Sequence, residues 1–152
     1  MPNRREHIGI ALIAQLGVEL LRKSDLSDDD RFWDVIGAAL GATCGGVLPD
    51  ILEPALSPDH RQFAHGMLPA AAVAWFGKGK HREGCDALYA WASAGLRPGE
   101  HAHAADGQNE LPRWMRFIVA GFFRAVPTGY VSHLLADATT PRGLPVFGRL
   151  GS

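Results

Sequence analysis

Two side chains able to bind a metal ion lie four residues apart in an apolar segment near the end of the chain. The segment runs from Tyr130 to Pro141 and contains His133 and Asp137. In a helix, this spacing places both side chains on one face, where a single ion could bind both. Polar groups on a buried helix face are costly unless something satisfies them. A metal ion would do so, although a hydrogen-bonded pair without metal fits the same spacing.

A second group of ligand-type residues lies in the first half of the chain. Asp50 follows Pro49, and His60 and His65 lie five residues apart in a segment that begins with helix-start signals. Five residues correspond to about 140° around a helix axis, so one histidine would bind the ion and the other would support it. Each also has a reading without metal: Asp50 as a turn former or helix cap, His60 as an exposed helix-start residue, and His65 as a hydrogen-bonded core histidine.

The remaining histidines give weaker indications of metal binding. His7 lies at the start of the expected first helix and is either a further ligand or an exposed terminal residue. His101 and His103 form an H-x-H pattern in a long glycine-rich stretch, which is more often a solvated loop than a metal site. His81 lies between two basic residues and reads as a surface residue.

The composition indicates one globular domain covering residues 1–152. The residues are 47% hydrophobic, and a chain of this length buries about 70% of its unfolded surface. Fifteen basic and sixteen acidic residues give a net charge of −1, so no basic excess points to duplex nucleic acid. The two cysteines, Cys44 and Cys85, form no metal or disulfide pattern and are expected to be packing residues in a reducing compartment.

Hydrophobic periodicity and helix-boundary residues predict an all-α fold, a compact bundle of five or six helices around an internal metal site. The expected helices cover about residues 5–23, 30–47, 58–76, 82–94, 112–125 and 128–138. Pro49 is expected to end the second helix, so that Asp50 lies in a turn. Pro127 either divides the last two helices or kinks one continuous helix.

Two of these helices carry signals about their packing. In the second helix, Gly37, Gly41 and Gly45 recur at four-residue spacing, which indicates close contact with another helix. The fourth helix is amphipathic, and its expected inner side carries Ala87, Leu88 and Trp91.

The apolar segments are short for a membrane-spanning helix. No uninterrupted apolar run reaches the roughly 18 residues expected of one, and the nearest covers residues 35–49. The charged start of the chain indicates no secretory signal. We therefore expect a soluble or peripheral protein in the cytoplasm, with association with the inner membrane as the alternative. Aromatic pairs near helix ends, Trp75-Phe76 and Trp114-Met115, fit interfacial anchors as well as ordinary core residues.

Three motifs resemble those of a known family. They are Gly-Gly-Val-Leu-Pro-Asp-Ile at 45–51, His-Arg-Gln-Phe-Ala-His at 60–65, and Gly-Tyr-Val-Ser-His-Leu-Leu-Ala-Asp-Ala-Thr-Thr-Pro-Arg-Gly-Leu-Pro at 129–145. With the early His7, they resemble the LexA-regulated, membrane-bound metal-dependent hydrolase family. That family is distantly similar to the zinc-dependent phospholipase C and single-strand nuclease group, an all-α fold with a buried metal cluster. The last motif is the specific part of the resemblance.

The resemblance implies a set of metal ligands, namely Asp50, His60, His65, His133 and Asp137, with His7 as an addition. It also implies that Arg61 binds an anionic substrate group and that Thr140 shapes the rim of the pocket. The family usually reads Pro-Asp-Ile-Asp in the first motif, whereas Leu52 stands in place of the second aspartate here and Glu53 follows it. Either one metal position is missing or Glu53 replaces it.

The leading functional hypothesis is a divalent-metal hydrolase acting on a phosphoester of a lipid or a nucleotide. Zinc is the first choice of ion, with manganese and iron as alternatives. Metal-activated water would be the nucleophile, with Asp50 or Glu53 accepting its proton and Arg61 holding the substrate. The competing hypothesis is a non-catalytic helical subunit that retains the metal site for structure. Two further interactions are compatible with the sequence: association of copies of this chain into a homo-oligomer, and contact with the membrane surface.

Overall fold

The computed structural model describes residues 4–52, 79–94 and 111–139. Within these ranges it contains four α-helices and no β-strand: α1 (Arg4–Leu21), α2 (Asp28–Leu52), α4 (Lys80–Ser93) and α5 (Arg113–Ala138). The expected all-α fold is confirmed for these residues, although four helices are seen there rather than five or six. The helix expected at 58–76 lies outside the described residues.

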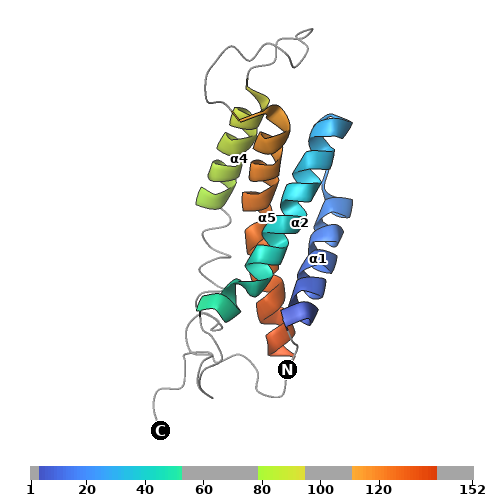
Figure 1. Cartoon of the computed structure of the whole chain (residues 1–152), viewed down its shortest axis with the longest axis vertical. Coiled ribbons are helices and arrows are strands. Elements are labelled where there is room, and N and C mark those ends of the chain that lie inside the picture. Colours follow the sequence, from blue (N-terminus) through green and yellow to red (C-terminus); the bar gives the residue numbers. More distant parts are fainter. Residues whose placement is uncertain (1–3, 53–78, 95–110, 140–152) are drawn as a thin grey trace.

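α2 and α5 form the centre of the bundle and make its most extensive contact. α1 packs against both of them, whereas α4 packs against α5, and Figure 1 shows α1 and α4 on either side of the central pair. α2 and α5 run in the same direction, because Gly37 and Gly45 of α2 lie at Ile118 and Val126 of α5 in the same order along both helices. α1 and α4 run in the opposite direction (Figure 1).

Backbone meets backbone along the contact between α2 and α5. A Cβ atom at Gly37, Gly41 or Gly45 would overlap a backbone carbonyl oxygen of α5. The same holds from the other side, because a Cβ at Gly121 or Gly129 would overlap a carbonyl oxygen of α2. The close helix contact predicted from the glycine spacing is therefore confirmed. Three fully buried alanines form a small core cluster at this contact: Ala38, Ala42 and Ala125.

Both internal prolines lie within continuous helices. We expected the second helix to end at Val47 with Asp50 in a turn, and this prediction is wrong, because α2 continues through Pro49 to Leu52. Proline removes one helical hydrogen bond and bends the axis without ending a helix whose neighbouring turns are packed. Figure 1 shows the last turn of α2 turning away from the axis of the rest. α5 likewise continues through Pro127, as one of the two alternatives predicted.

α4 presents a different face to the bundle from the one expected. The buried side chains of α4 are Cys85 and Ala92, whereas Ala87 and Trp91 are exposed. The physical reason is Tyr89, whose hydroxyl hydrogen-bonds groups of α2 and α5 and so rotates this side of α4 inward. Leu88 is half-buried, and the Trp91 ring lies under the guanidinium of Arg116, 5.5 Å from its Cζ.

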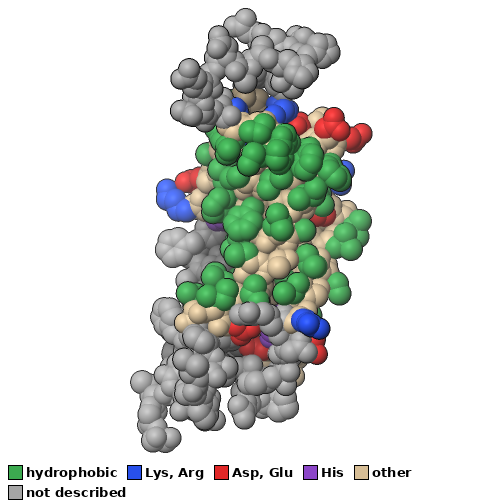
Figure 2. Space-filling view, viewed as in Figure 1, with side chains coloured by type: hydrophobic (Ala, Val, Ile, Leu, Met, Phe, Trp, Pro, Cys, Tyr) green, Lys and Arg blue, Asp and Glu red, His purple; other side chains and the backbone are tan. Residues whose placement is uncertain are grey.

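Large apolar side chains lie mostly on the outside of the described bundle. The buried core consists mainly of alanine and glycine, and its largest fully buried apolar side chains are Phe117 and Leu134. Figure 2 shows hydrophobic side chains covering much of the face in view. A soluble protein seldom exposes so continuous an apolar surface. The exposed large apolar residues of α1, α2 and α5 are Ile10, Leu12, Ile13, Leu16, Val18, Leu20, Leu21, Phe32, Val35, Leu40, Ile51, Leu52, Trp114, Phe123 and Leu135.

α2 corrects the expectation that no segment is suited to a membrane. With 25 residues it is about 37 Å long, and its length and composition are those of a helix able to cross a bilayer. The sequence analysis gave this helix too short a length because Pro49 was expected to end it. Its glycines were also taken as evidence against a membrane-spanning helix. Glycine is in fact frequent in membrane helices, where it permits close helix packing.

Replacing Gly41 by alanine tests the backbone contact. Its Cβ would overlap the carbonyl oxygen of Phe122, so α2 and α5 must move apart. We expect a loss of about 2–4 kcal/mol in the free energy of unfolding. The measurement is thermal unfolding followed by circular dichroism in one fixed detergent.

The matched control is Gly17→Ala in α1, where a new Cβ meets nothing within 4 Å. This variant should unfold at the parent temperature or slightly above it, because alanine favours a helix by up to about 1 kcal/mol over glycine. Equal effects of the two substitutions would refute the close contact.

Candidate metal centre

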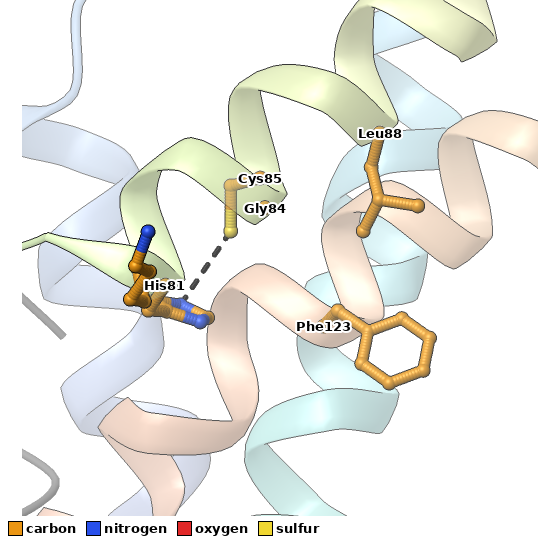
Figure 3. Close-up of a pocket in the computed structure, with 6 residues that line it drawn as sticks. His81, Gly84, Cys85, Leu88 and Phe123 are labelled. Atoms are coloured by element: carbon orange, nitrogen blue, oxygen red, sulfur yellow. Dashed lines mark hydrogen bonds between the residues drawn. The ribbon is translucent and has the colours of Figure 1, made fainter. Parts of the chain in front are cut away.

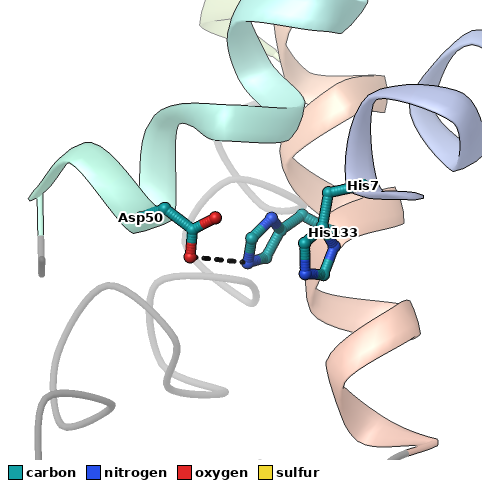
Figure 4. Close-up of side chains that lie close together, drawn as sticks. All are labelled: His7, Asp50 and His133. Carbon is teal, nitrogen blue, oxygen red and sulfur yellow. Dashed lines mark ion pairs between the residues drawn. The ribbon is translucent and has the colours of Figure 1, made fainter. Parts of the chain in front are cut away.

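Four ligand-type side chains from three helices meet at one end of the bundle. His7 comes from the first turns of α1, Asp50 from the last turn of α2, and His133 and Asp137 from the last turns of α5. His7, His133 and Asp137 are buried, whereas 32% of the Asp50 side chain is exposed. Figure 4 shows His7, Asp50 and His133 pointing toward one another.

The helix directions bring these residues together. Because α2 and α5 are parallel, the last turn of α2 lies beside the last turns of α5. Because α1 is antiparallel to both, its beginning lies at the same end. Gly46 allows the approach of α1, since a Cβ there would lie 2.8 Å from the Cβ of Ala11. His133 and Asp137 share a face of α5 at i, i+4, as their spacing predicted.

One hydrogen bond fixes the orientation of the His133 ring. Its Nδ1 lies 2.7 Å from the carbonyl oxygen of Gly46, which can only accept, so Nδ1–H is the donor. In the neutral ring the lone pair is then on Nε2. This atom lies 3.6 Å from Asp137 Oδ2 and 3.7 Å from Asp50 Oδ1. A backbone carbonyl on the far nitrogen is the usual support of a metal-binding histidine.

The spacing of the ligand atoms suits a cation between them. One ligand atom from each of His7, Asp50 and His133 lies within 4.8 Å of the other two. His7 Nε2 lies 3.6 Å from Asp137 Oδ1, and the His7 and His133 rings stack with centroids 3.8 Å apart. Tetrahedral ligands bound at about 2.1 Å lie about 3.4 Å from one another. The observed distances are near this value and longer than a hydrogen bond of about 2.7–3.2 Å.

Four of the nine predicted site residues fall within the described part of the chain. Within it, the structure brings together the four predicted metal ligands His7, Asp50, His133 and Asp137. Outside it lie the predicted ligands His60 and His65, the predicted catalytic residues Glu53 and Arg61, and the rim residue Thr140. Two imidazoles and two carboxylates are a donor set typical of zinc, manganese or iron, but metal binding itself stays a prediction.

A second polar cluster was missed in the sequence and lies deeper in the bundle. Arg124 Nη2 donates to Glu19 Oε1 at 2.6 Å and to Asp34 Oδ2 at 3.1 Å. The Tyr89 hydroxyl accepts from Arg124 Nε at 2.8 Å and donates to Asp34, which also pairs with Arg22. These five residues, the charge network, connect all four helices. Two carboxylates balance two guanidinium groups, as burial requires.

The sequence did contain a signal for the charge network. Asp34 and Arg124 are opposite charges within otherwise apolar helices, and such residues in an apolar helix face the interior of the bundle. Taken locally, Arg124 only interrupts an apolar run, and its pairing with Asp34 joins residues 90 positions apart. Glu19 gave no comparable signal, because it lies near the end of α1, where a charge is ordinary.

The hydroxyl of Tyr89 is strongly perturbed by this cluster. Burial, followed by the hydrogen bond to Asp34, raises the pKa of Tyr89 to about 12, while Arg124 opposes the shift. The tyrosine therefore stays protonated and acts as a hydrogen-bond donor throughout the physiological range. It stabilises the buried carboxylate of Asp34 rather than serving as an acid or base.

A surface pocket on α4 offers a less suitable site for chemistry. It is lined by Lys80, His81, Gly84, Cys85, Leu88 and Phe123. Figure 3 shows His81 and Cys85 on one side of it, with Nε2 and Sγ 3.5 Å apart. Burial raises the pKa of the Cys85 thiol, which keeps it protonated and a weak nucleophile. The cluster of His7, Asp50, His133 and Asp137 is therefore the stronger site.

Comparison with known families agrees with the membrane character of α2. Residues 1–148 match the family model described as YdjM inner membrane protein, so the chain belongs to this family. No curated protein and no solved structure matches the chain. The expected membrane-associated family is thus confirmed, whereas its hydrolase and nuclease similarity stays a prediction. Family membership and α2 together support the alternative of inner-membrane association, whereas the expected cytoplasmic location stays a prediction.

The pKa of Tyr89 predicts how stability depends on pH. The native value of about 12 exceeds the ordinary value of about 10, so the protonated form is favoured by folding. This contribution is fully present below about pH 10 and is lost as the pH rises from about 10 to 12. Thermal unfolding of the parent protein and of Tyr89→Phe, which lacks the ionisable group, should therefore converge over this range.

An ultraviolet titration of tyrosinate provides the check. The chain has two tyrosines, so Tyr89→Phe assigns the transition directly. The absorbance step near pH 12 should disappear in the variant. A step that disappears near pH 10 instead would contradict the buried hydrogen bond between Tyr89 and Asp34.

Proposed function

We propose that this protein is a divalent-metal-dependent hydrolase of a phosphoester, with zinc as the preferred ion. The observation that supports the proposal is the convergence of His7, Asp50, His133 and Asp137 from three helices at one end of the bundle. Few other functions require two imidazoles and two carboxylates at such distances in an otherwise apolar helical protein. The resemblance of the motifs to a metal-dependent hydrolase family points the same way.

Each residue of the cluster has a distinct part in this proposal. His133, held by the Gly46 carbonyl, presents Nε2 in a fixed direction, and the Asp137 carboxylate lies close to both imidazoles. A bound divalent ion would polarise the phosphoester and promote ionisation of water. Asp50 is the cluster member that reaches the surface, and its carboxylate accepts a proton from the attacking water.

The same distances also fit a second function without catalysis. A protonated His133 between Asp50 and Asp137 would form an ion-paired cluster at 3.6 and 3.7 Å. The cluster would then join α2 to α5 in a helical structural or interaction subunit. The two candidates differ in one measurable property, which is the amount of metal that the protein retains.

Elemental analysis distinguishes these candidates. The protein is purified in detergent without chelator and without a metal-affinity tag, and metal is quantified by mass spectrometry. We expect about one equivalent of zinc, manganese or iron in the parent. Asp50→Asn should lower it about tenfold or more, because losing one ligand typically costs at least that factor in affinity.

The matched control is His81→Asn, which removes a histidine of α4 outside the cluster and should retain the parent metal content. Asp50 is suited to the test because its side chain is partly exposed, so Asp50→Asn keeps the fold. A parent without metal, or equal metal in parent and Asp50→Asn, would favour the structural ion pair.

A further inference from the structure

We propose that a second copy of this chain packs antiparallel against the outer face of α1. The proposal goes beyond the proposed function and does not depend on it. It rests on three observations: the side chains that α1 leaves exposed, a glycine in that face with open space beside it, and opposite charges at the two ends of the face.

α1 has one face inside the bundle and one outside. The buried polar and charged residues of α1 belong to the inner face, which contacts α2 and α5. The outer face carries a stripe of residues at alternating spacings of three and four, here called the outer seam: Glu6, Gly9, Ile13, Leu16 and Leu20. At 3.6 residues per turn, these five positions lie within about 80° of arc.

The large side chains of the outer seam are among the most exposed apolar groups of the described bundle. Ile13, Leu16 and Leu20 expose 73%, 59% and 78% of their surface. A contiguous apolar patch of this kind marks an interaction site. Alternating spacings of three and four are the pattern by which two helices pack along one line of contact. The outer seam therefore suits another helix.

A second copy supplies a helix that fits, because the outer seam is complementary to itself. In a two-fold contact, residue i of one copy meets residue j of the other, and residue j meets residue i. In an antiparallel pair centred between positions 14 and 15, Ile13 faces Leu16 of the second copy, and Gly9 faces Leu20 of the second copy. Each layer thus joins two apolar positions.

Gly9 provides the space that this pairing needs. A Cβ at Gly9 would meet nothing within 4 Å in the described part of the chain, whereas a Cβ at Gly37 or Gly129 would overlap the backbone of a neighbouring helix. Glycine is less favourable than alanine inside a helix. Close helix contacts explain the glycines of α2 and α5, but contacts within the described bundle do not explain Gly9. Leu20 of a second copy would fill the space beside it.

The charges at the two ends of the outer seam select the antiparallel order. Glu6 lies in the first turn of α1, Lys23 follows its last residue by two positions, and both are exposed. In the antiparallel pair, Glu6 of each copy faces Lys23 of the other, which gives two ion pairs. A parallel pair would bring like charges together at both ends and would place Gly9 beside Gly9. Complementary charge thus fixes the direction of the contact.

The exposed charges of α4 do not oppose this contact. α4 packs against α5, and Figure 1 shows it on the other side of the central helices from α1. Lys80 and Glu83 pair with each other on the surface of α4, as do Arg82 and Asp86. The two-fold axis of the proposed dimer is perpendicular to the plane of the two α1 helices. Two copies that lie along a membrane surface would therefore have the same face toward the membrane.

Reversing the charges at the ends of the outer seam tests the proposal. The dissociation constant of the dimer is measured by sedimentation equilibrium of the full chain in a density-matched detergent. Glu6→Lys alone, or Lys23→Glu alone, replaces two attractions by two repulsions and should raise the dissociation constant about tenfold. The double variant restores attraction with the signs exchanged and should return to within about twofold of the parent.

The matched control is Lys80→Glu. It makes the same change of charge at a lysine of α4 whose side chain is 81% exposed, and it should keep the parent dissociation constant. Circular dichroism of each variant checks that the helical fold is retained.

Cysteine cross-linking determines the direction of the two helices. In a chain carrying Cys44→Ser and Cys85→Ser, a Gly9→Cys protein and a Leu20→Cys protein are mixed in detergent and oxidised. The antiparallel contact predicts a disulfide dimer that contains one chain of each kind, and at least about tenfold less dimer from either protein alone. A parallel contact predicts that Gly9→Cys cross-links to itself.

Three results would overturn the proposal. A parent that stays monomeric would show that lipid or another segment of the chain covers the outer seam. A dimer whose dissociation constant is unchanged in both single charge variants would place the contact elsewhere. Cross-linking of Gly9→Cys to itself would refute the antiparallel order. Recovery of the parent dissociation constant in the double charge variant, together with the mixed disulfide, would support it.

Discussion

The direct backbone contact between α2 and α5 is the constraint on which the rest of the described structure depends. Glycines at 37, 41 and 45 leave no room for a side chain opposite the carbonyl groups of α5. This contact keeps the two helices parallel and in register, and it sets Asp50 beside His133. It also brings the Gly46 carbonyl within 2.7 Å of the His133 ring. A wider spacing of the helices would break that bond and separate the potential ligands.

The same contact explains why many large apolar residues lie outside the bundle, while the charge network lies inside it. Small residues occupy the interface between α2 and α5, so many of the large apolar side chains project outward, whereas Phe117 and Leu134 are buried. In lipid such an arrangement is stable, because the exterior needs no water and buried polar groups hold the helices together. The charge network and the cluster at the end of the bundle are two such polar sites, at different heights. Arg124 pairs with two carboxylates in the first, and the second contains two imidazoles with no arginine among its described members.

Much of the site could be predicted from the sequence because its signals are local. The i, i+4 spacing of His133 and Asp137 depends on helix geometry alone, and the glycine repeat indicated a close helix contact. The continuation of α2 through Pro49 could not be predicted from local sequence. Whether a proline ends a helix or bends it depends on how the flanking turns pack. The face of α4 depended on the hydrogen bonds of Tyr89 to distant residues, which no local pattern contains. For His60 and His65, which lie outside the described residues, the sequence remains the basis of the prediction.

We propose that His7, Asp50, His133 and Asp137 bind one divalent ion, and X-ray absorption at the zinc edge is the sharpest test of this binding. Zinc-loaded protein should show a shell of nitrogen and oxygen atoms at about 2.0–2.1 Å, with the multiple-scattering pattern of imidazole rings. A sulfur shell at about 2.3 Å would place the ion at a cysteine such as Cys85 instead. A spectrum of fully hydrated zinc without imidazole would show that the cluster does not bind the ion.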